Sequence, residues 1–217
     1  MRLYLASTSP ARLALLRAAG VEPVTIPSDV DEPATVAAAE AEHGPLKTTA
    51  MVQLLARAKA EAVAGRHVDG APIDGLILGG DSAFELDGFS YGKPHESEIA
   101  RERWHMQRGR TGVLHSGHWL IDHRLATLHG GQAGRGLGAV ATASVTFADD
   151  ITDDEIDAYV ATGEPLAVAG AFTIDSLGGP FITRVDGDPS TVVGLSLSTL
   201  RRLVREIGVE WTDLWNR

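Results

Sequence analysis

Two short segments carry side chains suited to binding a phosphorylated molecule. The first, residues 7–12 (STSPAR), joins an expected strand over residues 3–6 to an expected helix. Backbone N–H groups at a helix N-terminus attract an anion, and the hydroxyl groups, Ser7 among them, and the Arg12 guanidinium add further donors. This combination indicates a phosphate cradle. An ordinary capped helix, with Ser9 at the N-cap, explains the same residues without a ligand.

The second segment, Gly79-Gly80-Asp81-Ser82, follows an expected buried strand over residues 76–78. Glycines allow close approach, so a carboxylate at the C-terminal end of the strand is well placed for a metal or a water nucleophile. Glu32 closes an acidic turn and could hold a divalent cation together with Asp81. Mg²⁺ binds through one or two carboxylates and completes its shell with phosphate oxygens and water. A turn aspartate that caps the backbone, and a solvated Glu32, are the structural alternatives.

Lysine is unusually rare among the basic residues. Sixteen of the nineteen are Arg, and the three lysines are Lys47, Lys59 and Lys93. Lys59 lies on an expected helix over residues 48–64, and Lys93 follows an expected hairpin that turns at Asp87-Gly88. A compact ammonium group suits a phosphate, although a helical lysine is usually a solvated residue.

Length and charge restrict the class of protein. The 217 residues are 44% hydrophobic and show no linker, so we expect one domain of two lobes over residues 1–217. The net charge of −10 argues against non-specific binding to nucleic acid or to an anionic membrane. The absence of cysteine excludes thiolate catalysis and Cys-ligated zinc. The longest uncharged run, residues 136–148, is too short to span a membrane, so we expect a soluble cytoplasmic protein.

Strands and helices are mixed along the whole chain, which favours an α/β fold with two lobes around a cleft. Thr152 and Glu155 form a capping box before one helix, and a loop with a weak helix is expected over residues 33–45. The other expected strands cover about residues 24–26, 112–122 and 139–147, and the other expected helices about residues 97–107 and 198–207.

Two patterns resemble functional motifs but have simpler explanations. Gly134-x-Gly136-x-Gly138 precedes an expected strand rather than a helix, so a hairpin loop is favoured over a dinucleotide-binding loop. His115 and His118, with His123 and His129 nearby, suggest a metal site. At three-residue spacing on a strand, however, the first two face opposite sides.

The order and spacing of these motifs resemble the Maf family of nucleoside triphosphate pyrophosphatases over nearly the whole chain. Each motif is short, but the ordered set is specific. In chain order the motifs include Leu5-Ala6-Ser7-Thr8-Ser9-Pro10, Asp31-Glu32, Ala58-Lys59-Ala60, Gly80-Asp81-Ser82, Gly92-Lys93-Pro94, Gly109-Arg110-Thr111, Tyr159-Val160-Ala161-Thr162-Gly163-Glu164-Pro165 and Val192-Val193-Gly194-Leu195.

The resemblance implies a mixed-sheet fold of the Maf and ITPase type, a homodimer, and cleavage between the α- and β-phosphates. It implies a divalent cation, Mg²⁺ with Mn²⁺ or Co²⁺ as alternatives, held by Glu32 and Asp81. Asp81 matches the position of the proton acceptor for the attacking water. Ser7, Arg12, Lys59 and Lys93 match positions that bind the phosphates.

The chain departs from the family pattern at several positions. Ala11 stands where a first Arg is usual, and Ser82 where Thr is frequent in the branch that prefers dTTP and UTP. Asp175 aligns with a Gln of that branch, so we expect Ala11, Ser82 and Asp175 to bear on substrate choice. Val168 and Thr191 replace a usual Lys and a usual Asn.

The resemblance favours a housecleaning pyrophosphatase that removes non-standard or excess nucleotides. A second hypothesis belongs to another class: a nucleotide-binding regulator of septum formation with little catalysis. Six motif residues are present together, which favours the enzyme, because a regulator could lose Asp81 or Glu32 without penalty. These residues are Ser7, Arg12, Glu32, Lys59, Asp81 and Lys93. A nucleic-acid-binding module is disfavoured by the acidic charge.

Overall fold

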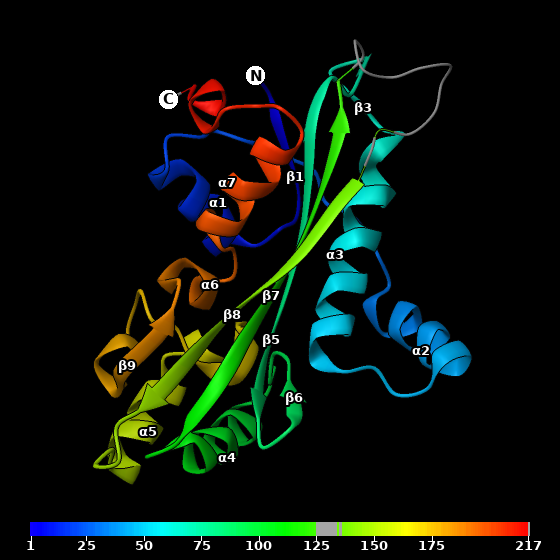
Figure 1. Cartoon of the computed structure of the whole chain (residues 1–217). Coiled ribbons are helices and arrows are strands. Elements are labelled where there is room, and N and C mark those ends of the chain that lie inside the picture. The colour runs from blue at the N-terminus through cyan, green and yellow to red at the C-terminus, as the bar shows by residue number, and fades with distance from the viewer. Residues whose placement is uncertain (125–133, 135, 217) are drawn as a thin grey trace.

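A mixed seven-stranded sheet organises the chain in the computed structural model, which describes residues 1–124, 134 and 136–216 (Figure 1). Its strand order is β2-β1-β5-β7-β8-β9, with β6 added beside β5. β1 runs parallel to β2 and β5, and the remaining pairs are antiparallel. The strands are β1 (Leu3–Ala6), β2 (Val24–Thr25), β5 (Gly75–Leu86), β6 (Phe89–Tyr91), β7 (Thr111–His123), β8 (Gly136–Phe147) and β9 (Ile182–Gly187), with a separate pair β3 (His67–Val68) and β4 (Ala71–Pro72).

Helices cover both faces of the sheet and one of its ends. In Figure 1, α3 lies on one side of the long strands and α1 and α7 lie on the other, while α4 and α5 lie at the far end. Among the described residues, no helix is long and apolar enough to cross a membrane. The α-helices are α1 (Pro10–Ala18), α2 (Glu32–His43), α3 (Thr48–Ala64), α4 (Ser97–Gln107), α5 (Asp153–Ala161), α6 (Pro189–Val193) and α7 (Leu197–Glu206).

The hydrophobic core lies on both faces of the sheet, and side chains of the same strands contribute to both parts. Leu5 and Leu78 pack with Leu16 and Leu200, on the side of α1 and α7. The neighbouring Ile77 packs on the α3 side. Successive strand residues point to opposite faces, so a single strand supplies both cores.

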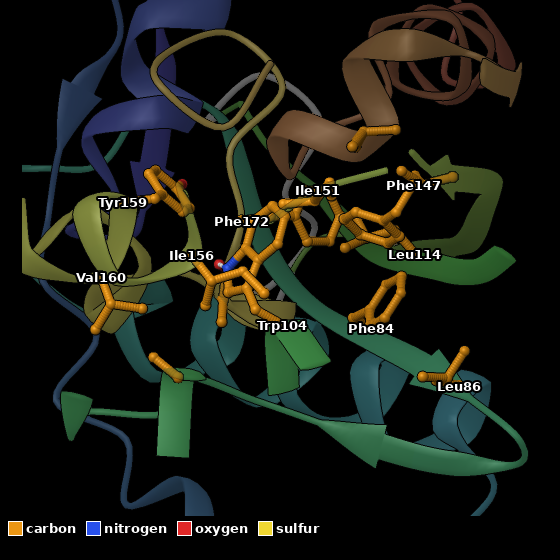
Figure 2. Packing of buried hydrophobic residues seen from close by; sticks show 14 of the residues in the cluster. Phe84, Leu86, Trp104, Leu114, Phe147, Ile151, Ile156, Tyr159, Val160 and Phe172 are labelled. Atoms are coloured by element: carbon orange, nitrogen blue, oxygen red, sulfur yellow. Dashed lines mark hydrogen bonds between the residues drawn. The ribbon is translucent and has the colours of Figure 1, made fainter. Parts of the chain in front are cut away.

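An aromatic cluster forms a further core at the end near α4 and α5 (Figure 2). Phe84, Trp104, Phe147, Tyr159 and Phe172 make edge-to-face contacts with ring centroids between 5.0 and 6.0 Å apart. The long strands connect this end with the α1 and α7 end, which confirms the mixed α/β fold. A division into two lobes around a cleft stays a prediction.

Strand β5 continues well beyond the expected end at residue 78. β1 pairs with it only as far as Gly79, and β6 begins to pair at Phe84. On the other edge β7 pairs with β5 without interruption, opposite Asp81 at Gly117. The prediction that Asp81 follows the end of a strand is therefore wrong. Asp81 lies within the strand, where the edge between β1 and β6 is left open among the described residues.

The glycines that suggested a strand end serve instead to let α3 approach the sheet. A Cβ on Gly79 would lie 2.0 Å from the carbonyl oxygen of Ala56, and one on Gly117 would lie 2.3 Å from that of Val52. Such distances leave no room for a side chain. The absence of these two Cβ atoms thus allows α3 to pack closely against β5 and β7.

Most of the other expected elements are confirmed. Helix α3 has the expected bounds, and Thr152 and Glu155 form the expected capping box. The loop with a weak helix expected over residues 33–45 is in fact a 12-residue helix with Asp31 at its N-cap, because alanine-rich sequence has high helix propensity. Part of the Gly-rich connection before β8, and His129, lie outside the described residues.

Replacing Gly79 with Ala tests the close approach of α3. The new methyl group would meet backbone, which cannot rotate away, so we expect a loss of about 1–3 kcal/mol in the free energy of unfolding. Gly65→Ala is the control, because nothing lies within 4 Å of its Cβ position. Urea denaturation measures both variants. Equal midpoints for the two would show that α3 does not lie where the structure has it.

Candidate active site

A buried lysine joins two carboxylates at the open edge of β5. The Nζ atom of Lys59, on α3, lies 2.7 Å from Oδ1 of Asp81 and 2.7 Å from Oε1 of Glu32. Lys59 and Asp81 are each 8% exposed, whereas Glu32, the first residue of α2, is about half exposed. Three separate elements therefore bring one cation and two anions together, with Glu32 on the solvent side.

The surroundings of Asp81 alter its affinity for protons. Burial raises the pKa of the Asp81 carboxyl above its usual value, and the positive charges of Lys59 and Arg12 oppose this effect. A carboxylate with a raised pKa is a better proton acceptor than an exposed one. A buried, electrostatically perturbed carboxylate at an open edge is a typical feature of an active site.

Arg12 occupies the opposite face of the same strand. Its Nε donates to the carbonyl oxygen of Gly194 at 2.8 Å, its Nη1 to Ser7 Oγ at 3.2 Å and its Nη2 to Ser82 Oγ at 3.0 Å. Burial lowers the pKa of Arg12, while Asp81 and Glu32 oppose that shift, so the field of both carboxylates reaches this guanidinium. Arg12 thus connects the loop after β1, strand β5 and the segment after α6.

Successive residues of β5 point to opposite faces of the sheet, which explains why the site has two sides. Gly79 and Asp81 face α3, whereas Gly80 and Ser82 face Arg12. A Cβ on Gly80 would lie 3.2 Å from Arg12 Nε, so glycine makes room for the guanidinium. The cap expected at α1 is also present, since Ser9 Oγ accepts from the Arg12 backbone N–H. That cap supports the structural interpretation of Ser9, while Ser7 lies against the guanidinium.

The predicted site residues fall into two groups. The structure brings together Ser7, Arg12 and Ser82 on one face of β5, and Glu32, Lys59 and Asp81 on the other. Three further predicted residues lie outside these two groups: Lys93 is exposed after β6, Ala11 lies in the first turn of α1, and Asp175 is exposed in the segment before β9.

Several residues that contact the site were not singled out from the sequence. Ser116 Oγ lies 3.0 Å from Ser82 Oγ and donates to the carbonyl oxygen of Thr191. The Gly194 carbonyl accepts from both Arg12 and Ser82. The Val-Val-Gly-Leu motif drew attention to the segment that contains Gly194. It could not indicate that the backbone carbonyl of Gly194 contacts the site, because every residue has such a carbonyl.

His118 is held by backbone groups on the Arg12 side of β7. Its Nε2 accepts from the N–H of Ser196 at 2.9 Å, and its Nδ1 lies 3.0 Å from the Ser116 carbonyl oxygen. Burial lowers the pKa of His118 to about 4, so the ring is neutral at pH 7. Both nitrogens are occupied, which leaves neither for a metal.

The residues present fit a divalent cation that also binds phosphate. Among the described residues, no group of three His, Cys, Asp or Glu side chains forms a complete metal cage. Glu32 and Asp81, however, both contact the Lys59 ammonium group, so the two carboxylates lie close together. Mg²⁺ commonly takes only one or two carboxylates together with phosphate oxygens. Two oxygen donors beside an open edge match that demand.

Comparison with known proteins identifies one matching family and several similar proteins. The family model described as Maf-like protein matches residues 2–207. Curated proteins named nucleoside triphosphate pyrophosphatase are 75% identical in Leifsonia xyli, over 100% of this chain and 98% of that protein, and 51% identical in Salinispora tropica, over 100% and 88%. The Staphylococcus aureus Ham1 protein, a solved structure, is 13% identical with a TM-score of 0.39, over 69% of this chain and 73% of that one.

The family match covers nearly the whole chain and agrees with the motifs and with the contacts that those motifs make around β5. The chain belongs to the Maf family.

Proposed function

We propose that the protein hydrolyses nucleoside triphosphates to the monophosphate and pyrophosphate. The observation that carries the proposal is the buried Asp81 carboxylate, with its raised pKa, held beside Lys59 and Glu32 at the open edge of β5. The names of the curated relatives support the same activity. With a net charge of −10, the protein needs local cations to attract a triphosphate, and Lys59 and Arg12 supply them.

The proposed reaction is an in-line displacement at the α-phosphorus. Asp81 accepts a proton from a water molecule as the water oxygen bonds to phosphorus, and the bond to the oxygen that bridges the α- and β-phosphates breaks. Pyrophosphate leaves with that oxygen. The positive charges of Lys59 and Arg12 stabilise the negative charge that develops on the phosphates.

Glu32 and Asp81 would hold a divalent cation, Mg²⁺ with Mn²⁺ or Co²⁺ as alternatives, which supplies additional charge neutralisation for the phosphates. Lys93, exposed after β6, is proposed to add charge for the same phosphates. A homodimer and a cytoplasmic location stay predictions from the family resemblance.

A panel of nucleoside triphosphates, scored for pyrophosphate against orthophosphate, tests the activity. Tight nucleotide binding without release of either product would favour a regulator.

The substitution Asp81→Asn tests the proton acceptor. An amide cannot take the proton from water, so we expect kcat to fall by roughly 10²–10⁴-fold. The fold should survive, because Lys59 keeps its contact with Glu32. Pyrophosphate release measures activity, circular dichroism the fold, and Asp154→Asn on α5 is the control. Near-normal turnover by Asp81→Asn would remove this residue from the mechanism.

The three lysines allow a test that leaves the net charge unchanged. The guanidinium of Lys59→Arg is too bulky for a buried ammonium that lies 2.7 Å from two carboxylates, so we expect a loss of activity of at least roughly 10-fold. Lys93→Arg should also reduce activity if Lys93 contacts phosphate. Lys47→Arg, exposed before α3, is the control. Equal kcat/KM for all three variants would mean that neither motif lysine has a special role.

The dependence of kcat/KM on pH reports the protonation of Asp81. The ionised form is the active one, so the rate should fall as the pH drops through a pKa that lies above the ordinary 3.8. Because the charge of Lys59 lowers that pKa, Lys59→Met should move the acidic limb to higher pH. The control Lys47→Met should leave the limb in place. A shift to lower pH in Lys59→Met would contradict the assignment.

A further inference from the structure

One carboxylate connects the starts of two helices beside Arg12. Asp188 is the N-cap residue of α6, and its Oδ1 accepts from the backbone N–H of Ser190 at 2.9 Å and from the Ser190 hydroxyl at 2.6 Å. Its Oδ2 accepts from the hydroxyl of Ser196, the N-cap residue of α7, at 2.7 Å, and from the Ser198 hydroxyl at 2.6 Å. An ordinary capping aspartate accepts from the first turn of a single helix. Asp188 therefore fixes α6 and α7 relative to each other.

The serine hydroxyls extend this restraint to the backbone. Ser190 Oγ accepts from the N–H of Leu197 at 2.9 Å, and Ser196 Oγ accepts from the N–H of Thr199 at 3.1 Å. Each hydroxyl donates its one hydrogen to Asp188, so its lone pairs are free for these N–H groups. Burial alone would raise the pKa of Asp188, but the hydrogen bonds from the serines outweigh that effect and hold the pKa well below its usual range. The carboxylate is therefore ionised and accepts from all of them.

The turn between the two helices carries Gly194. Its φ of 118° lies in the left-handed region, which favours glycine. Its carbonyl oxygen accepts from Arg12 Nε at 2.8 Å and from the Ser82 hydroxyl at 3.2 Å. A backbone carbonyl is oriented by the chain on either side of it, and Asp188 holds the chain on both sides of this turn.

Strand β7 holds the same turn from the sheet. The Ser116 hydroxyl donates to the Thr191 carbonyl oxygen at 3.0 Å, and His118 Nε2 accepts from the N–H of Ser196 at 2.9 Å. These contacts do not involve Asp188. A variant without the Asp188 carboxylate should therefore still fold, with a turn that is less restricted.

The direction of the Arg12 guanidinium depends on this turn more than on its other partners. The three contacts of Arg12 with Ser7, Ser82 and Gly194 all go to neutral oxygen atoms. The two serine hydroxyls can rotate, whereas the Gly194 carbonyl is part of restrained backbone. A guanidinium has five N–H donors, so two remain for a phosphate. A side chain that is already oriented loses less conformational freedom when a ligand binds.

We propose that Asp188 is a positioning residue for Arg12: its carboxylate fixes the turn between α6 and α7, and with it the Gly194 carbonyl that orients the guanidinium. The consequence for phosphate binding rests on the proposed function. Asp188 itself touches no reacting group, and its effect reaches the phosphates only through Arg12.

Hydrogen exchange at Arg12 tests the positioning without a ligand. With nitrogen-15-labelled arginine, NMR measures the exchange of the Arg12 Nε–H with solvent, and Arg12→Lys identifies its signal by the loss of that signal. We expect Asp188→Ala to speed this exchange at least roughly 10-fold, because the Gly194 carbonyl is released more often. Asp188→Asn, which keeps the shape and one acceptor oxygen, takes its place if Asp188→Ala does not fold.

Affinity for inorganic pyrophosphate, the leaving group of the proposed reaction, tests the consequence. We expect Asp188→Ala to weaken binding roughly 10-fold, about the value of one hydrogen bond to a charged group. Loss of a negative charge alone would strengthen the binding of an anion, so a weaker affinity cannot come from charge. In the Arg12→Met background, the same substitution should leave the remaining affinity unchanged, because Asp188 then has no guanidinium to position.

The matched control removes a helix cap at the far end of the sheet. Thr152→Ala takes the cap from α5, so it should lower the thermal midpoint but change neither Arg12 exchange nor pyrophosphate affinity. Unchanged Arg12 exchange in Asp188→Ala, or an equal loss of affinity with and without Arg12, would overturn the proposal. A wild-type protein that neither binds pyrophosphate nor turns over a triphosphate would remove the proposed function, while the exchange measurement would still decide whether Asp188 orients Arg12.

Discussion

The contact of one buried ammonium group with two carboxylates determines how the site is built. Lys59 lies on a helix, Asp81 on a strand and Glu32 at the start of another helix, and all three meet only because α3 lies very close to β5. That closeness depends on glycine at residues 79 and 117. Removal of one partner from a buried ion pair typically costs about 3–5 kcal/mol, so these charges and the packing of α3 depend on each other.

Arg12 connects three segments of the chain on the opposite face of β5. Three of its N–H groups contact Ser7, Ser82 and the Gly194 carbonyl, which come from the start, the middle and the end of the chain. Its charge also reaches Asp81 electrostatically. One short stretch of β5 therefore presents the Asp81 carboxylate on one face and contacts Arg12 on the other, and both groups belong to the charge balance of the proposed reaction.

Much of the fold could be predicted because its signals are local. Helical spacing of apolar residues placed α3, and cap residues placed the starts of α1 and α5. Glycines were misinterpreted, since Gly79 and Gly80 look like a strand end when neighbours in space are unknown. Their actual role, to admit the Ala56 carbonyl on one face and Arg12 on the other, depends on residues distant in sequence.

The sequence by itself determined the family, the residue types suited to phosphate chemistry and the rarity of lysine, which singled out Lys59. Only the tertiary structure decided which of these residues meet. It joined Glu32, Lys59 and Asp81, and it put Arg12 with Ser7 and Ser82. The physical reason is that a side chain's chemistry is set by its own atoms, whereas its pKa, burial and partners are set by atoms that the fold brings from elsewhere.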